Sequence, residues 1–327
     1  MNISVRLSLL TAMTTVIIAG CQSGATPNLT FNPDEQAPTQ PTTISEPTST
    51  AGKEQPVTPP APDPVLGDTI IRPLDGMEIV YVPGGDFVMG SDEQDVDLAL
   101  QQCLAYGTNC ARGYFSVEMP LHSVILVSFW IDKTEVTSRQ YLKCEQDGVC
   151  EPVKCEIEGD HYPVVCVTWS QAAVYCQWSG VRLPTEAEWE YSARGPERNA
   201  YPWGDEFEGT LLNYCDSNCT LNKRDEQFDD GYAGSAPVGS YPLGASWVGA
   251  LDMAGNVWEM VADWNGAYSE QDQLNPSGPQ TGSRRVARGG SWHASPDHVR
   301  SALRTHMGPN DTVDHAGFRC AQSPQQD

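Results

Sequence analysis

Ten cysteines limit the folds open to this chain. The sequence has 327 residues and eleven cysteines, all of which except Cys21 lie between positions 103 and 320. An even number of cysteines in an exported protein predicts disulfides, in this case five. Cysteines that are neighbours in sequence could close small loops by pairing as Cys103–Cys110, Cys144–Cys150, Cys155–Cys166 and Cys215–Cys219. Cys176 and Cys320 would then be left over. The sequence leaves the connectivity open. A zinc site is the competing interpretation, but the sequence has no Cys-x-x-Cys motif and no histidine at ligand spacing beside these cysteines.

The N-terminal residues predict export. Arg6 precedes an apolar run at 7–18, which is too short to span a bilayer. Ile18-Ala19-Gly20-Cys21 resembles a bacterial lipobox, so we expect a signal peptide at 1–20 and lipidation of Cys21. Ordinary secretion with an unpaired Cys21 is the alternative. Gln22 follows the cysteine, which by resemblance to proteobacterial lipoproteins favours a bacterial envelope protein anchored in the outer membrane, on its periplasmic or surface face.

Composition divides the rest of the chain into a tether and a domain. Residues 21–67 are rich in Pro, Thr and Ser, which predicts a disordered, polyproline-like spacer after the lipidated cysteine. Residues 68–324 have the composition of one globular domain, and 325–327 form a tail. The formal net charge of -24 repels nucleic acid and anionic lipid, so we exclude nucleic acid as a partner. The lipid anchor is the expected membrane contact.

Three helices and a few short strands can be predicted. Thr137 with Gln140 resembles a capping box for a helix that stops near Gly148, and Thr185 with Glu188 resembles a second. Ser170 can cap a third helix, which ends at Gly180. The strand candidates are 78–82, 123–130 and 286–288, separated by long segments rich in Gly, Pro, Asn and Asp. This pattern predicts an α+β domain with little regular secondary structure.

Four sequence blocks carry a family resemblance. They are GVRLPTEAEWEYSARG at 180–195, GNVWE at 255–259, RGGSW at 288–292 and GFRC at 317–320. In this order they resemble the formylglycine-generating enzyme (sulfatase-modifying factor) family, whose fold is related to the C-type lectin fold. The resemblance implies a domain stabilised by disulfides and calcium. It also implies that Cys176 pairs with Cys320, because the corresponding cysteines of the family pair.

The resemblance further implies two structural calcium sites. Calcium prefers six or more oxygen ligands from carboxylates and carbonyls on a bent loop. On the family pattern, the first set would be the side chains of Asp252 and Glu259 with the carbonyls of Gly255 and Val257. The second set would be the side chains of Asn213 and Asp230 with the carbonyls of Tyr214 and Tyr232. Without the resemblance, each cluster would be interpreted as a solvated acidic loop.

The catalytic residues of the oxidase members are missing. Those enzymes bind copper through two cysteines soon after the Gly-Gly-Ser motif, whereas this chain has no cysteine between Cys219 and Cys320. A thiolate copper centre therefore cannot form there. Iron stays open, because four of the six histidines lie in this part of the chain. His293 and His298 are the candidate catalytic residues, with Asp297, His306 and His315 nearby; the alternative is loop histidines bonded to backbone or water.

Two hypotheses of function follow. The first is an envelope-anchored binding or scaffold module that displays cleft loops, including the polar loop at 268–285, to an unidentified protein, peptide or glycan. The second is a divergent oxidoreductase that uses iron or copper near His293 and His298. We expect Arg300 and Arg304 to lie beside the cleft or to anchor buried carboxylates such as Glu186, Glu188 or Glu190. The sequence has no nucleophile elbow, phosphate loop or His-Glu-x-x-His motif.

Overall fold

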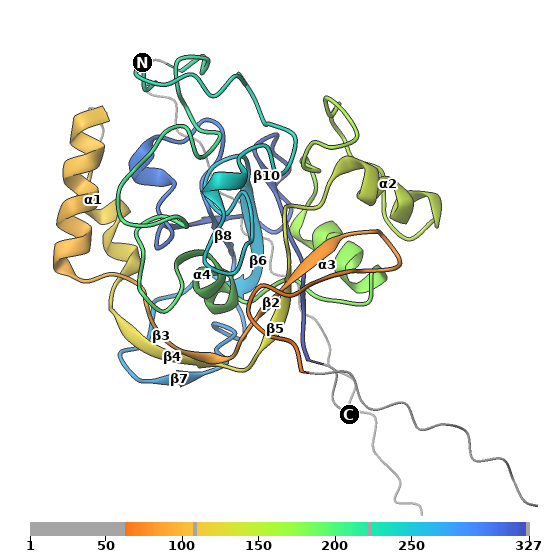
Figure 1. The fold of residues 1–327 in the computed structure, drawn as a ribbon, viewed down its shortest axis with the longest axis horizontal. Helices are drawn as coiled ribbons and strands as arrows, with labels where there is room; N and C mark the ends of the chain where they lie inside the picture. Colours follow the sequence, from red (N-terminus) through yellow and green to blue (C-terminus); the bar gives the residue numbers. More distant parts are fainter. Residues whose placement is uncertain (1–62, 107–109, 222–223, 325–327) are drawn as a thin grey trace, which may run out of the picture. The chain divides into compact units, whose positions relative to one another are not determined.

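The computed structural model describes residues 63–106, 110–221 and 224–324 (Figure 1). The predicted signal peptide at 1–20, Cys21, most of the predicted tether and the tail at 325–327 lie outside the described residues. None of the helices in the described part has an apolar run long enough to cross a membrane.

In the described residues, eleven short strands form three sheets, and strands that are neighbours in sequence often belong to different sheets. One sheet has the order β1-β2-β5-β11, another β10-β6-β8-β9, and the third β3-β4-β7. The strands are β1 (Thr69–Ile71), β2 (Glu78–Val82), β3 (Gly85–Met89), β4 (His122–Leu126), β5 (Phe129–Asp132), β6 (Trp258–Trp264), β7 (Gln273–Leu274), β8 (Arg285–Arg288), β9 (Arg304–Met307), β10 (Ala316–Gly317) and β11 (Ala321–Gln322).

The predicted strand at 123–130 is in fact two strands. β4 pairs with β3, whereas β5 pairs with β2, so the chain changes sheets between Leu126 and Phe129. Gly84, which links β2 to β3, packs against this corner, where an added Cβ would lie 2.8 Å from the Ser128 nitrogen. The prediction was wrong here because a continuous apolar pattern does not reveal which partner strand each half finds.

Four α-helices are described: α1 (Glu93–Tyr106), α2 (Ser138–Gln146), α3 (Trp169–Trp178) and α4 (Glu186–Arg194). The capping boxes of α2 and α4 are confirmed, with Thr137 and Thr185 as N-caps. Ser170 does not cap α3, because Thr168 and Gln171 form the capping box two residues earlier. Helix α1 was not predicted, since its hydrophobic face is weak. The 3₁₀ turns are η1 (Arg112–Tyr114), η2 (Ser116–Glu118), η3 (Pro242–Gly244) and η4 (Pro296–His298).

Helix α4 lies at the centre of the described domain, where it packs on β3, β6 and β8 (Figure 1). Every residue of α4 is buried, including its three glutamates and Arg194. Trp189 and Ala193 lie in the core, as their spacing predicted. The helix therefore brings charged groups into the interior, and these groups need partners there.

All five predicted disulfides are present. The local bridges are Cys103–Cys110, Cys144–Cys150, Cys155–Cys166 and Cys215–Cys219. Cys176 of α3 joins Cys320 across 144 residues of sequence. In the chain-entropy model a bridge closing a loop of this length stabilises a fold by about 5 kcal/mol. It joins the middle of the domain to its C-terminal end.

Candidate functional site

The segment that replaces the cysteine pair of the oxidases forms a loop and the turn η4. This turn packs against helix α1, the helix that the sequence did not predict. His298 Nδ1 lies 2.6 Å from Asp297 Oδ2, and its ring contacts that of Phe115. Burial opposes ionisation of Asp297, but the contact with His298 lowers the pKa of Asp297 below its ordinary value.

His293 has different neighbours. Its Nδ1 lies 3.3 Å from Ser291 Oγ, and its ring centroid is 4.2 Å from that of His315. Burial and His315 lower the pKa of His293 to about 4, so this imidazole is neutral at pH 7. His306 is exposed on β9. Within the described ranges, no three His, Cys, Asp or Glu side chains are grouped so that they could hold a metal ion.

The second predicted calcium set comes together in one loop region. Asn213 donates through Nδ2 to the Gly234 carbonyl at 2.9 Å, while its buried Oδ1 has no hydrogen-bond partner. The carboxylate of Asp230 accepts hydrogen bonds from the amides of Tyr214 and Tyr232. Burial raises the pKa of Asp230 to about 7, and the nearby Asp216 adds to the shift. An unpartnered amide oxygen in the same loop region as a buried carboxylate fits a hard cation, which would supply the missing positive charge.

The first predicted set is more closely engaged with protein groups. Glu259 accepts from Arg319 at 2.6 and 2.7 Å and from the indole nitrogen of Trp189 at 2.8 Å. Asp252 accepts from the amide of Gly239 and lies beside Glu135, which the sequence analysis missed. Burial raises the pKa of both Glu135 and Asp252. The nearby carboxylates of Asp252 and Glu259 add to the shift of Glu135, and Glu259 adds to that of Asp252. Glu259 already has a cation in Arg319, so the Asn213/Asp230 set fits calcium better.

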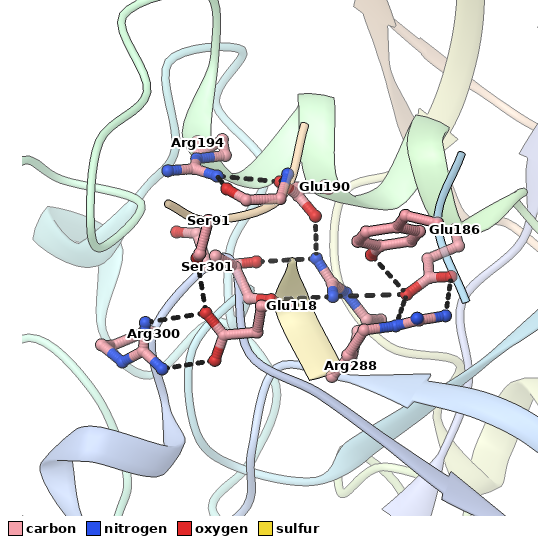
Figure 2. A network of polar contacts seen from close by, with 12 residues as sticks. Ser91, Glu118, Glu186, Glu190, Arg194, Arg288, Arg300 and Ser301 are labelled. Atoms are coloured by element: carbon pink, nitrogen blue, oxygen red, sulfur yellow. Dashed lines mark hydrogen bonds and ion pairs between the residues drawn. The ribbon is translucent and has the colours of Figure 1, made fainter. Parts of the chain in front are cut away.

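A network of buried ion pairs extends from α4 (Figure 2). Glu190 accepts from Arg194 at 2.9 Å and also pairs with Arg288. Burial opposes ionisation of Glu190, but the two guanidinium groups lower its pKa below the ordinary value. Arg288 is fully buried, contacts Glu186 at 3.4 Å and donates to the carbonyls of Ser301 and Ala302.

The two arginines highlighted by the sequence differ in their partners. Arg304 binds both oxygens of Glu186, at 2.8 and 2.7 Å, as expected. Arg300 pairs with Glu118 instead, at 3.1 and 2.5 Å, and Ser91 donates to the same carboxylate (Figure 2). Glu118 lies in the segment after α1, far from Arg300 in sequence. No spacing rule could therefore identify this pair.

A pocket of about 310 Å³ lies at the N-terminal end of α4, beneath the loop at 265–279. It includes part of the polar loop that the sequence analysis proposed as a display surface. Glu186 and Arg304 lie at its base with Tyr268, whose hydroxyl donates to Glu186 at 2.9 Å. Met89, Trp264, Pro276 and Pro279 contribute apolar surface. The arrangement suits a small ligand group that has both an apolar and a polar part.

Asp263 also lines this pocket, and sequence reasoning missed it. Its Oδ2 accepts the backbone amide of Glu186 at 2.8 Å, at the start of α4. Burial raises the pKa of Asp263 to about 7, and the Glu186 carboxylate contributes to the shift. A signal was present, because Asp263 and Glu259 lie four residues apart in β6. Period two therefore places both carboxylates on the same, buried face of that strand.

Comparison with known proteins identifies the family. The model of the sulfatase-modifying factor enzyme 1-like domain matches residues 71–324. The formylglycine-generating enzyme of Mus musculus is 37% identical over 302 residues, covering 76% of each chain. That of Thermomonospora curvata is 41% identical over 174 residues, covering 50% of this chain and 56% of its own. An inactive Cα-formylglycine-generating enzyme 2 of Bos taurus is 37% identical over 166 residues, covering 49% of this chain and 50% of its own.

A solved structure agrees with the expected fold. PvdO from Pseudomonas aeruginosa superposes with a TM-score of 0.63 at 25% identity, covering 80% of this chain and 100% of that one. The α+β fold with few helices, open sheets and several disulfides is therefore confirmed. The chain spans only 56% of the length of the Thermomonospora relative, and the family includes a protein named as inactive. By sequence and fold, this chain belongs to the sulfatase-modifying factor enzyme 1-like family, which contains the formylglycine-generating enzymes.

Proposed function

We propose that this protein is an envelope-anchored binding module that has lost the oxidation of cysteine to formylglycine. One observation carries the proposal: all ten cysteines between positions 103 and 320 are joined in disulfides. No thiol pair is left among them for Cu(I), which selects soft thiolate ligands. The bovine relative named as inactive is consistent with loss of activity within the family.

The geometry around the histidines also favours binding over oxidation. His293 contacts Ser291 and His315, whereas His298 contacts Asp297, so the two candidate residues have separate surroundings. A nonheme iron centre needs two or three imidazoles and a carboxylate around one point. In contrast, the pocket beneath the loop at 265–279 is a formed cavity with polar and apolar walls. We assign ligand binding to this pocket.

An activity assay tests the proposal. The full chain, purified in detergent, is incubated with Cu(I), oxygen and a cysteine-containing sulfatase-type peptide. We expect no aldehyde in the peptide by mass spectrometry, while an active family member converts it under the same conditions. Repeated turnover by this protein would overturn the proposal. Turnover that persisted with copper removed and ended in His293→Ala or His298→Ala would favour the iron-dependent alternative.

The membrane anchor is a separate part of the proposal. It rests on the lipobox-like residues Ile18-Ala19-Gly20-Cys21 and the Pro-rich residues that follow. Cys21→Ala should abolish acylation and remove the protein from the outer-membrane fraction, with the uncleaved signal detected by mass spectrometry. Density-gradient separation of the wild-type membranes should place it with the outer membrane. Wild-type protein without acyl chains would refute the anchor.

Calcium is proposed as a structural cofactor. The unpartnered Oδ1 of Asn213 and the raised pKa of Asp230 support an ion in that loop. Asn213 and Asp230 are not among the residues that line the pocket beneath the loop at 265–279. Calcium would therefore order the fold and take no part in ligand binding.

A further inference from the structure

The pocket beneath the loop at 265–279 contains two buried carboxylates with unequal partners. Glu186 has a guanidinium group on both oxygens and a tyrosine hydroxyl as well. Asp263 is only 3% exposed, and the hydrogen bond described for its carboxylate comes from a backbone amide. Among the described residues, no lysine, arginine or histidine forms an ion pair with Asp263. One carboxylate is thus fully compensated and the other is not.

The loop is packed tightly around Asp263, so the pocket is preformed. Gly278 has φ +67°, and an added Cβ there would lie 2.9 Å from Asp263 Oδ1. An added Cβ at Gly266 would lie 2.5 Å from Pro279. Because these contacts leave no room for side chains, the two glycines allow the loop to pack closely beside the Asp263 side chain. A ligand entering the pocket meets fixed walls, which reduces the entropy cost of binding.

Electrostatics favours a cation as the missing partner. A buried carboxylate without a counter-charge is unfavourable, and a cationic donor stabilises it more than a neutral one does. The raised pKa of Asp263 agrees with this imbalance, although Arg304 partly offsets burial and the nearby Glu186 and Glu188. The net charge of -24 also draws cations toward the molecule.

The walls limit what kind of cation fits. Met89, Trp264 and the prolines at 276 and 279 present apolar surface along the cavity. A volume of about 310 Å³ holds an alkyl chain with a charged end, but not a folded partner. We propose that Asp263 binds the ammonium group of a primary amine, such as a lysine side chain of a partner peptide, whose methylenes contact the apolar walls. This inference rests on the proposed binding function and names its ligand class.

Calorimetry with a matched pair of probes tests the inference. Nα-acetyl-lysine methylamide carries the ammonium group, and its Nε-acetylated form has the same backbone without the charge. We expect the charged probe to bind the full-length protein about 10- to 100-fold more tightly, the range for a hydrogen bond to a charged group. Equal affinity for the two probes, or binding of neither, would overturn the ammonium assignment.

Variants locate the effect. Asp263→Asn keeps an oxygen that can accept the Glu186 amide but removes the charge, and it should lose the preference for the charged probe. Asp314→Asn makes the same charge change at a side chain that is 71% exposed and outside the pocket, so it should bind as wild type does. Unchanged binding in Asp263→Asn would refute the assignment.

A pH series on the wild-type protein and on Asp263→Asn gives a second test. Binding of the charged probe should weaken from pH 8 to pH 5, because protons compete for the Asp263 carboxylate. His122 also lines the pocket, and the charges of Glu186, Glu188, Arg304, Arg182 and Arg285 act on Asp263, so the series is repeated with Asp263→Asn. The dependence should shrink in that variant; an undiminished one would contradict the role of Asp263.

The cysteine-peptide assay separates this inference from the proposed function. The protein could lack oxidase activity and bind a neutral or anionic ligand in the pocket equally well in the wild type and in Asp263→Asn. In that case the binding function stands and the ammonium inference fails. Turnover of the cysteine peptide would remove the basis of both.

Discussion

Glu190 and Asp263 are buried carboxylates on neighbouring elements, yet their surroundings differ. Glu190 lies inside α4 with Arg194 and Arg288 as ion-pair partners (Figure 2). Asp263 lies in β6 at the wall of a pocket, with a backbone amide as the donor described for it. The arginines lower the pKa of Glu190 despite its burial, whereas burial raises the pKa of Asp263 to about 7.

This contrast separates a structural charge from one that is available to a ligand. Around Glu190 the molecule supplies the counter-charges that burial requires, so these residues hold the fold together. Around Asp263 a cavity takes the place of a counter-charge. The general inference is that a buried, uncompensated charge beside a preformed pocket marks a functional site better than a large cluster of paired charges does.

Removing the positive charge of Arg288 from the ion pairs around Glu190 should have the largest effect on the free energy of unfolding. Arg288→Met leaves Glu190 with one partner and removes donors to two backbone carbonyls. Loss of one partner from a buried pair costs about 3–5 kcal/mol. Urea unfolding followed by circular dichroism measures this change.

The matched control is Arg224→Met, because Arg224 pairs with Glu226 at exposed positions. Exposed pairs contribute about 0–1 kcal/mol. Similar losses in the two variants would show that burial of the pair does not matter. If Arg288→Met fails to fold, Glu190→Gln tests the same pair with a smaller change.

Calcium should give the next largest effect, since the Asn213/Asp230 loop is another region with an uncompensated carboxylate. At about 100 times its Kd, calcium should stabilise the protein by about 2.7 kcal/mol, and a chelator should reverse this. The gain should vanish in Asp230→Asn and persist in Asp229→Asn, whose side chain is exposed. A calcium-independent midpoint in wild-type protein would exclude an ion in this loop.

The Asp263 carboxylate should make stability depend on pH. Its folded pKa of about 7 exceeds the ordinary 3.8, so the folded state holds the extra proton between these values. Stability from this group is therefore present below about pH 4 and lost as the pH rises through about 7. As the pH rises from 5 to 8, the free energy of unfolding of Asp263→Asn should increase relative to that of the wild type by on the order of 2 kcal/mol. Parallel pH profiles for the two proteins would rule out the raised pKa.

The smallest expected effect comes from the loop over the pocket. Gly278→Ala places a Cβ against Asp263 and forces alanine into a left-handed conformation. Strain of this kind costs about 1–3 kcal/mol, and an exposed loop relieves part of it. We expect a loss near 1 kcal/mol in thermal unfolding together with weaker binding of the charged lysine probe. Gly113→Ala, at a glycine with open space around its Cβ position, is the control.

Local patterns predicted the features that depend on residues close in sequence. Thr137 with Gln140 and Thr185 with Glu188 form the expected capping boxes, because their partners are three residues apart. The four local disulfides join cysteines separated by 4 to 11 residues, so proximity in the chain alone suggested them. The long bridge from Cys176 to Cys320 needed the family resemblance as well.

Contacts between distant segments could not be predicted in this way. Glu118 and Arg300 are 182 residues apart, and Asp263 meets the start of α4 across 77 residues. Neither separation follows from a helical or strand period. Helix α1 was missed because its hydrophobic face is weak, and its packing against η4 joins segments far apart in the sequence.

By itself, the sequence determined the family, the starts of α2 and α4, the four local disulfides and the absence of a cysteine pair after the Gly-Gly-Ser motif, since each depends on residue identity and short spacing. The tertiary structure alone decided which buried charges are paired, because burial and counter-charge are properties of the surroundings and not of the residue. Asp263 is an ordinary aspartate in the sequence. It becomes a candidate binding group because the fold buries it, gives it no ion-pair partner among the described residues and places it beside a pocket.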